Sequence, residues 1–325
     1  MLVNGEHGEQ LLCEEQHDGS FKLYRVFGSL DTLVLPERMD GRPITVIGAY
    51  CFAEQGRLPE HLTEEIRAAG LGDGTTAAAG SLRPLNGNYL REICLPDSVV
   101  CLETYAFYNC RKLERLTVGA ALTEINSDAF MNCRALHVLD IRASAAEPTG
   151  LPYLLNQLTA ELSVGFVGGE QVRLLYPEYS ESYEEIGPAH IFSLHVEGEG
   201  YRARKQFADG VLDIRGYDTV FEKARNEEQF VTLMKMALYR LMYPYELSEK
   251  AKYGYESYLK AHEEQVLGQL VHVRDEENLR LLCGQALISD TAIQSAVICA
   301  VAEGWTRGVA GIIRWRNADA CRDTD

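Results

Sequence analysis

Histidine, cysteine and carboxylate side chains carry most enzymatic and metal chemistry in proteins, and in this sequence they are scattered. The eight histidines show no His-Glu-x-x-His spacing, the nine cysteines show no Cys-x-x-Cys pair, and the chain has neither a Gly-x-Ser-x-Gly elbow nor a Walker loop. His190 and His195 are five residues apart across an expected strand, so their side chains should face opposite sides. We therefore predict no catalytic residues, no metal site, no cofactor, and cysteines that are reduced thiols.

Two local stretches superficially suggest a ligand site. Gly70-Leu-Gly-Asp-Gly74 has the composition of a phosphate cradle, but it lacks the preceding strand, the following helix and the lysine, so we predict a flexible loop. The run from Glu178 to Glu185 lacks the ligand spacing of a calcium loop and predicts a solvated acidic loop. Tyrosines often anchor protein interfaces, which makes three of them secondary partner-binding candidates: Tyr176, Tyr179 and Tyr183.

A recurring phrase indicates the architecture that must position any site. Leu90-Arg-Glu-Ile-Cys-Leu95 returns at Leu113 and again at Leu136, a spacing of 23 residues each time. Ala106-Phe107 and Asn109-Cys110 also return 23 residues later, at 129–130 and 132–133. Repeats of this size predict a stacked coil in which equivalent apolar positions form one continuous interior, with Cys110 and Cys133 buried inside it.

The short strand of each coil turn predicts a candidate binding face. If Ile93 and Leu95 point inward, the alternating residues point outward onto one exposed row. The row consists of Glu92, Arg115, Thr117, Val138, Asp140 and Arg142, which are our partner-binding candidates. The alternative is a sheet face that is merely solvated or is covered by the next domain.

These repeats resemble the BspA-type leucine-rich repeat family of bacteria. Leu90, Ile93, Leu95 and Pro96 match its unit in one copy, together with Val99, Leu102, Ala106, Phe107 and Cys110, and the next copy matches from Leu113 to Cys133. The resemblance covers about residues 20–142 and implies a leucine-rich coil. By analogy, it also implies binding of a protein partner.

The remaining segments predict shorter elements. Strands are expected at 10–15 and 21–27 as an N-terminal hairpin, and at 172–176, 191–196 and 211–214, with helices at 59–69 and 151–162. From residue 226 the pattern is helical: one helix ends before Pro244, another runs from 248 to about 272, and two helix pairs follow at 261–273 with 277–286 and at 290–302 with 306–316. The pairs resemble ankyrin-like helices.

We therefore predict an α+β chain in three parts. Residues 1–144 are the leucine-rich repeat domain, a short β-solenoid-like coil with an N-terminal β-hairpin cap and a helix and loop insertion at 53–89. Residues 145–225 form a small mixed β module, and residues 226–325 form an ankyrin-like array of helical hairpins.

Charge and hydropathy limit the partners. Lys and Arg number 31 and Asp and Glu 48, a formal charge of -17, which disfavours nucleic acid and anionic membranes. We expect no membrane insertion, no signal peptide and a cytoplasmic location as written, or an extracellular one if a leader precedes Met1. The predicted function is a non-enzymatic protein–protein interaction scaffold with an unknown protein partner. The alternatives are an enzyme with an unrecognised site in 150–225 and an exported adhesion or ligand-binding module.

Overall fold

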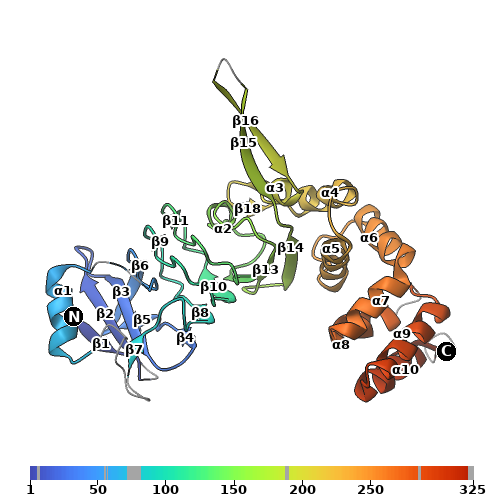
Figure 1. Ribbon diagram of the computed structural model, residues 1–325, viewed down its shortest axis with the longest axis horizontal. Coiled ribbons are helices and arrows are strands. Elements are labelled where there is room, and N and C mark those ends of the chain that lie inside the picture. Colours follow the sequence, from blue (N-terminus) through green and yellow to red (C-terminus); the bar gives the residue numbers. More distant parts are fainter. Residues whose placement is uncertain are drawn as a thin grey trace. The chain divides into compact units, whose positions relative to one another are not determined.

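The computed structural model describes residues 1–5, 8–54, 56, 58–71, 82–186, 190–284 and 287–320. It divides into two compact units, 1–214 and 215–325 (Figure 1). The glycine-rich stretch at 70–74 falls mostly outside the described residues, as does His7. The three-part division stays a prediction.

The first unit is built around a coil of parallel strands. One sheet, which we call the repeat sheet, has the order β14-β13-β12-β10-β8-β4, and all its pairs are parallel except β13 with β14. Its strands are β4 Thr32–Val34, β8 Glu92–Cys94, β10 Arg115–Gly119, β12 Val138–Arg142, β13 Leu162–Phe166 and β14 Val172–Tyr176.

A second sheet forms the other wall of the coil and joins it to the N-terminal cap. Its order is β1-β2-β3-β6-β9-β11, and β3, β6, β9 and β11 pair in parallel. The strands are β1 Leu2–Asn4, β2 Gln10–Glu15, β3 Phe21–Gly28, β6 Arg42–Ile47, β9 Cys101–Leu102 and β11 Glu124–Ile125, with β5 Arg38–Met39 on β6 and β7 Arg83–Pro84 on β3. The first unit is therefore a β-solenoid from β3 to β13, with the predicted N-terminal hairpin, β2–β3, as its cap.

The interior of the coil confirms the stacking that the 23-residue phrase predicts. Ile93, Leu116 and Leu139 are direct neighbours across three strands and are at most 2% exposed. On the opposite side of the interior, the rings of Phe52, Phe107 and Phe130 stack with centroid separations of 4.9 and 5.2 Å. Side chains at equivalent positions thus contact each other from turn to turn, so each turn buries the apolar edge of its neighbour.

The corners of the coil repeat as closely as its core. Tyr105 and Asp128, 23 residues apart, both have left-handed backbone conformations with φ of 60° and 57°. Asn109 and Asn132 do the same with φ of 60° and 65°, and the Asn132 Nδ2 donates to Asn109 Oδ1 over 2.8 Å. Asparagine tolerates this conformation better than most residues, which explains its place at a recurring tight corner.

The coil continues beyond the last clear repeat. After helix α2 (Leu151–Leu155), which is shorter than the predicted 151–162, β13 joins the repeat sheet and the predicted strand β14 folds back onto it. Gln157 closes the other side: its Oε1 accepts from the Ala129 N–H and its Nε2 donates to the Asn126 carbonyl. The side chain thereby satisfies backbone groups that a further coil turn would otherwise pair with.

Around the coil, one prediction is confirmed and another is wrong. Helix α1 (Glu60–Ala68) lies where an amphipathic helix was expected, and its Leu62 packs on Leu12 and Phe27 of the cap. The predicted acidic loop is instead strand β15 (Ser180–Ile186), paired antiparallel with β16 (Ile191–Glu197) in a hairpin that projects from the first unit (Figure 1). The glutamates of β15 favour a loop, but its conformation is determined by pairing with the apolar strand β16.

Short elements follow the hairpin before the second unit begins. They are α3 (Gly200–Ala203) and the two-residue strands β17 (Phe207–Ala208) and β18 (Val211–Leu212). The strand expected at 211–214 is therefore shortened, because α4 begins at Ile214.

The second unit is a helical array. Its helices are α4 Ile214–Ala224, α5 Phe230–Met242, α6 Glu249–Ala261, α7 Glu263–His272, α8 Glu276–Cys283, α9 Asp290–Ala302 and α10 Thr306–Ala320. Helix α5 ends before Pro244 as predicted, whereas the expected helix over 248–272 breaks at His262. The pair α7–α8 contacts the pair α9–α10, which confirms an ankyrin-like stack of helical hairpins. Among the described residues, no helix has both the length and the apolar character that a bilayer crossing requires.

Candidate binding face of the repeat sheet

The strands of the repeat sheet place the six predicted face residues side by side. Glu92, Arg115 and Val138 are direct neighbours in one row, Thr117 and Asp140 are neighbours in the next, and Arg142 pairs with Gly119 at the end of β10. Their side chains alternate with the buried leucines and isoleucines, so they lie on the outer face of the sheet, as expected. Glu92 is exposed, four of the residues are half-buried, and Asp140 is buried.

Asp140 organises the centre of this face. Its Oδ2 accepts from Arg115 Nη1 over 2.5 Å, and its Oδ1 accepts from Arg173 Nη2 over 2.7 Å. Arg173 Nη1 also donates to Ser163 Oγ over 2.9 Å, which fixes that guanidinium across three strands. One carboxylate therefore orients two guanidinium groups, and the cluster keeps a net positive charge inside an acidic chain. Sequence reasoning missed Arg173, although its alternate position in the predicted strand 172–176 is a signal for it.

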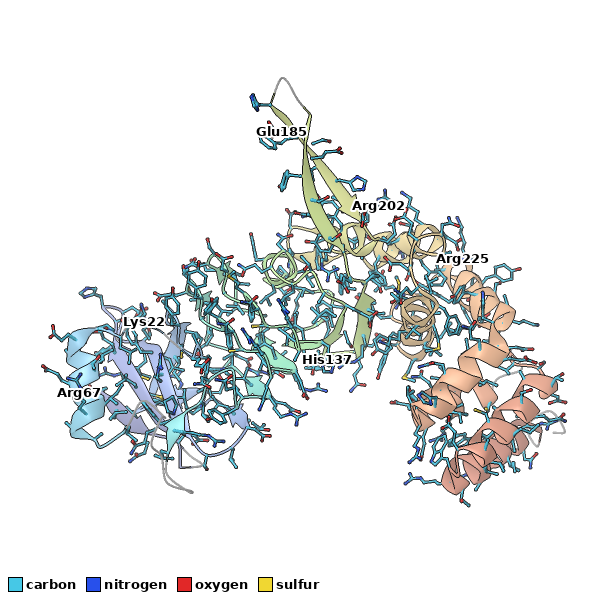
Figure 2. All side chains as sticks on the ribbon, viewed as in Figure 1. Lys22, Arg67, His137, Glu185, Arg202 and Arg225 are labelled. Carbon is cyan, nitrogen blue, oxygen red and sulfur yellow. The ribbon has the colours of Figure 1, made fainter. Side chains whose placement is uncertain are left out.

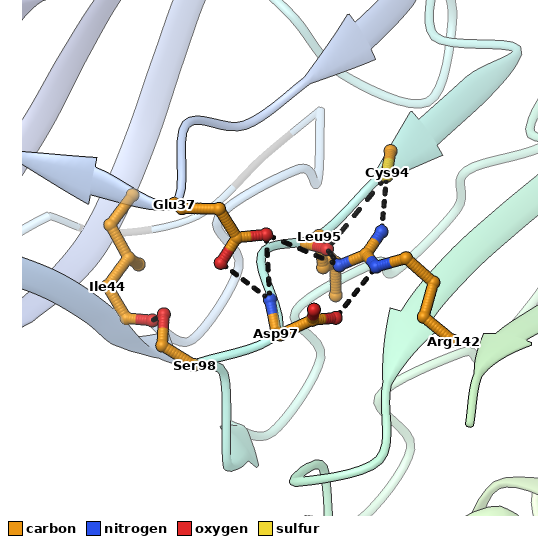
Figure 3. Close-up of polar contacts among 7 residues, drawn as sticks. All are labelled: Glu37, Ile44, Cys94, Leu95, Asp97, Ser98 and Arg142. Atoms are coloured by element: carbon orange, nitrogen blue, oxygen red, sulfur yellow. Dashed lines mark hydrogen bonds and ion pairs between the residues drawn. The ribbon is translucent and has the colours of Figure 1, made fainter. Parts of the chain in front are cut away.

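Arg142 is the most tightly held residue of the face (Figure 3). Its Nε donates to Asp97 Oδ1 over 2.7 Å, and its Nη2 donates to the Leu95 carbonyl over 2.5 Å. Its Nη1 contacts the Cys94 sulfur, and Glu37 lies 3.6 Å from Nη2. Burial lowers the pKa of Arg142, but the hydrogen bond to Asp97 and the nearby Cys94 thiol outweigh it and raise that pKa. Arg142 thus links its own coil turn to the turns that carry β8 and β4, which helps to hold the face in shape.

The secondary tyrosine candidates separate into two kinds. Tyr176 and Tyr179 are 0% and 7% exposed, and their ring centroids lie 5.8 and 4.9 Å from the guanidinium carbon of Arg204. That buried guanidinium donates to the carbonyls of Leu158, Pro177 and Ala160, so it ties the end of the coil together. As surface anchors these two tyrosines were wrongly chosen, because they pack around an interior cation.

Tyr183 is the tyrosine that stays at the surface. It is 69% exposed on β15, directly opposite Leu194 of β16, and Phe192 on the same side of the hairpin is 64% exposed. Glu185, opposite Phe192, lies beside this apolar group on the hairpin (Figure 2). The pairing of an apolar strand with an acidic one creates this surface, which the sequence of either strand does not predict alone.

The repeated cysteines are held by packing in the interior of the coil. The Cys110 and Cys133 thiols donate to the carbonyls of Phe52 and Phe107 over 3.3 and 3.1 Å, and burial raises the pKa of Cys110. Both are buried free cysteines, as predicted. His190 lies in a turn beside Glu185 and His195 lies on β16, so they do not form a common site. Within the described ranges, no group of three or more His, Cys, Asp or Glu side chains is arranged to hold a metal ion.

Fold and face together define a β-solenoid repeat protein with an open sheet face. The family model described as "BspA type Leucine rich repeat region (6 copies)" matches residues 85–147. The matched segment carries all six strand-face candidates, from Glu92 to Arg142. Neither a curated protein nor a solved structure matches the chain.

Proposed function

We propose that this chain is a non-enzymatic protein–protein interaction scaffold that binds its partner through the outer face of the repeat sheet. The leucine-rich repeat family supports the general class, since such coils present extended surfaces to other proteins. The observation that carries the proposal is the ordered guanidinium pair around Asp140, which lies in the middle of a half-exposed strip of the sheet face.

The chemistry of this strip suits protein recognition. The Arg115 side chain is 41% exposed although Asp140 holds it, so its remaining N–H groups are available in a fixed orientation. A prearranged guanidinium loses less conformational entropy on binding than a free one, and its planar fork matches a carboxylate of the partner. Thr117 and Val138 beside it provide a small apolar surface, and Glu92 adds an acceptor at one end.

The hairpin provides a second contact surface for the same function. Tyr183, Phe192 and Leu194 form an exposed apolar group on one side of it, and exposed aromatic groups of this kind commonly anchor interfaces. The hairpin also carries acidic side chains and no Lys or Arg between residues 178 and 197. Its charge favours a partner region that is basic, whereas the strip around Arg115 favours an acidic one.

Affinity capture with matched variants tests the proposal. The variant Glu92→Arg/Val138→Glu changes two outward side chains without touching the clamp at Arg142, so we expect unfolding within about 0.5 kcal/mol of the unmodified chain. Proteins captured by the unmodified chain should be lost. The control Glu124→Arg repeats the Glu-to-Arg exchange at an exposed position of β11, on the other sheet, and should retain them. Equal capture by both variants would reject the repeat sheet as the binding face.

The alternative function is an enzyme with an unrecognised site in 150–225. Arg204 lies in that segment, but its guanidinium is buried and donates to backbone carbonyls of the coil end, with the Tyr176 and Tyr179 rings beside it. This packing removes Arg204 and the two tyrosines from the candidates for such a site.

A further inference from the structure

A cavity of about 550 Å³ lies in the second unit, within the size range of small-ligand pockets. It forms where α4 and α6 end and α5 and α7 begin. Helix C-termini attract cations and helix N-termini attract anions, so two ends of each kind offset one another. The side chains therefore decide which charge the cavity favours.

Aromatic rings form the inner part of the cavity. Tyr258 is 5% exposed, and the His262 ring lies against it with a centroid separation of 4.5 Å. The Phe230 ring centroid lies 6.0 Å from that of His262, and the buried Leu233 completes this surface. Aromatic faces carry partial negative charge, so a group of them is a favourable environment for a cation.

The charged side chains at the cavity are mainly carboxylates. Glu222 and Glu228 line it, against a single cationic side chain, Arg225. The His262 Nδ1 lies 2.9 Å from the Tyr258 carbonyl. A carbonyl only accepts, so Nδ1 must carry the hydrogen, and the neutral ring then has an acceptor at Nε2. A ligand that donates N–H bonds and carries positive charge fits this arrangement.

The cavity already contains a loosely held cation. The Arg225 guanidinium (Figure 2) lies 5.9 Å from the Tyr258 ring centroid and 3.5 Å from Glu222, and its side chain is 41% exposed. Both separations are at the long end for such contacts, and exposed ion pairs contribute little. Arg225 thus occupies the place of a ligand cation without being fixed there.

We propose that this cavity binds a guanidinium or ammonium group, such as a basic side chain of a peptide, and that Arg225 moves aside when it does. Glu222 and Glu228 supply the opposite charge, and Tyr258 and Phe230 supply the ring faces. This site lies in the helical unit, so it is separate from the face of the repeat sheet. The strongly acidic chain, with a formal charge of -17, further favours basic ligands by long-range attraction.

Titration of the full chain with Nα-acetyl-arginine amide, followed by calorimetry and by the backbone amide signals of Phe230 and Tyr258, tests the proposal. The neutral isostere Nα-acetyl-citrulline amide should bind at least about tenfold more weakly, because it lacks the charge that the two carboxylates recognise. The variant Glu222→Gln/Glu228→Gln should lose a similar factor. Arg225→Gln should instead strengthen binding severalfold, since it removes the competing resident cation.

Two comparisons separate this result from a fold defect and from an anion site. Glu256→Gln removes a carboxylate of α6 that pairs with Lys252 outside the cavity lining, so it should leave the affinity unchanged. Inorganic phosphate should not compete. Equal binding of the citrulline and arginine compounds, weaker binding by Arg225→Gln, or competition by phosphate would each overturn the proposal, because each shows that the cavity does not recognise a cation.

Discussion

In the first unit, the rings of Phe52, Phe107 and Phe130 occupy the same position in successive turns, and each contacts the next. In the second unit, the most buried polar contact occurs at a single place: Arg240, 0% exposed, donates to Asp218 over 2.7 Å. Tyr255 Oη donates to the same carboxylate over 2.8 Å. The coil thus repeats one kind of contact along its length, whereas the ion pair between α4 and α5 of the helical unit is specific to that position.

The two kinds of contact differ in how the loss of one residue affects the stability of the rest of the unit. In a stacked coil, stability is close to a sum of turn and nearest-neighbour contributions, so the middle of a stack matters more than its end. A buried ion pair is different, because removal of one partner leaves the other charged and without compensation. The two units should therefore respond differently to single substitutions. Both tryptophans, Trp305 and Trp315, lie in the second unit, so tryptophan fluorescence reports on that unit alone.

Phe107→Ala should have the largest effect on the coil. Its ring is 0% exposed and stacks on both neighbours, so the substitution removes two contacts and leaves a cavity, at a cost of roughly 3–5 kcal/mol. Phe130→Ala removes a ring that stacks on one neighbour and should cost less. Urea unfolding followed by far-UV circular dichroism measures both. If both substitutions lower the free energy of unfolding equally, ring stacking between turns does not determine the stability of the coil.

Arg240→Met should destabilise the helical unit by roughly 3 kcal/mol, because Asp218 remains buried with no cation beside it. The double variant Asp218→Asn/Arg240→Met removes both charges and should recover part of that loss. Tryptophan fluorescence during urea unfolding follows the helical unit. A double variant as unstable as the single one would contradict a charge effect and indicate lost packing.

The two regions also differ in how far their sequence predicts them. The 23-residue phrase predicts the coil, its buried side chains and its outward row. This is possible because the local pattern of apolar residues is enough to tell which positions of each repeat are buried. The ion pair Asp218–Arg240 joins residues 22 positions apart that share no pattern, and nothing in the sequence marks either as buried. For the same reason the role of Arg142 as a clamp was missed, because its partners Asp97 and Glu37 come from other turns. The strand at 191–196 was predicted, but its partner β15 was missed because its acidic side chains indicate a loop.

Alkaline pH should destabilise the coil more steeply than the helical unit. Burial raises the pKa of Cys13 to about 12 and that of Cys51 further, whereas the pKa of Cys283 in the helical unit rises to about 11. Unfolded thiols ionise near their ordinary pKa of 9, so above that pH the unfolded state releases protons that the folded state keeps. The stability that these thiols contribute is complete below pH 9 and declines from there towards pH 12.

Urea unfolding at pH 8, 9.5 and 10.5 measures this decline in each unit. The far-UV dichroism transition, which includes the coil, should shift to lower urea more steeply than the tryptophan transition, which follows the helical unit alone. Cys13→Ala/Cys51→Ala removes two of the coil thiols and should flatten its pH dependence. If that variant keeps the full slope, the buried thiols are not its cause and the tyrosines are the next candidates, since burial also raises the pKa of Tyr176.

The smallest expected change in stability compares two helix caps of the helical unit, one that contacts its own helix only and one that also contacts another helix. Ser248 and Ser289 both cap helices, and each Oγ accepts a backbone N–H three residues on over 3.2 Å. Ser289 alone also contacts another helix: its Oγ donates to Glu263 of α7 over 2.5 Å. Ser248→Ala should cost about 1 kcal/mol as a lost cap, whereas Ser289→Ala should cost about twice that, because it also breaks a link between stacked pairs. If the two substitutions reduce the free energy of unfolding equally, α7 and α9 are held together by their apolar contacts alone. The helical unit then resembles the coil in relying on stacking.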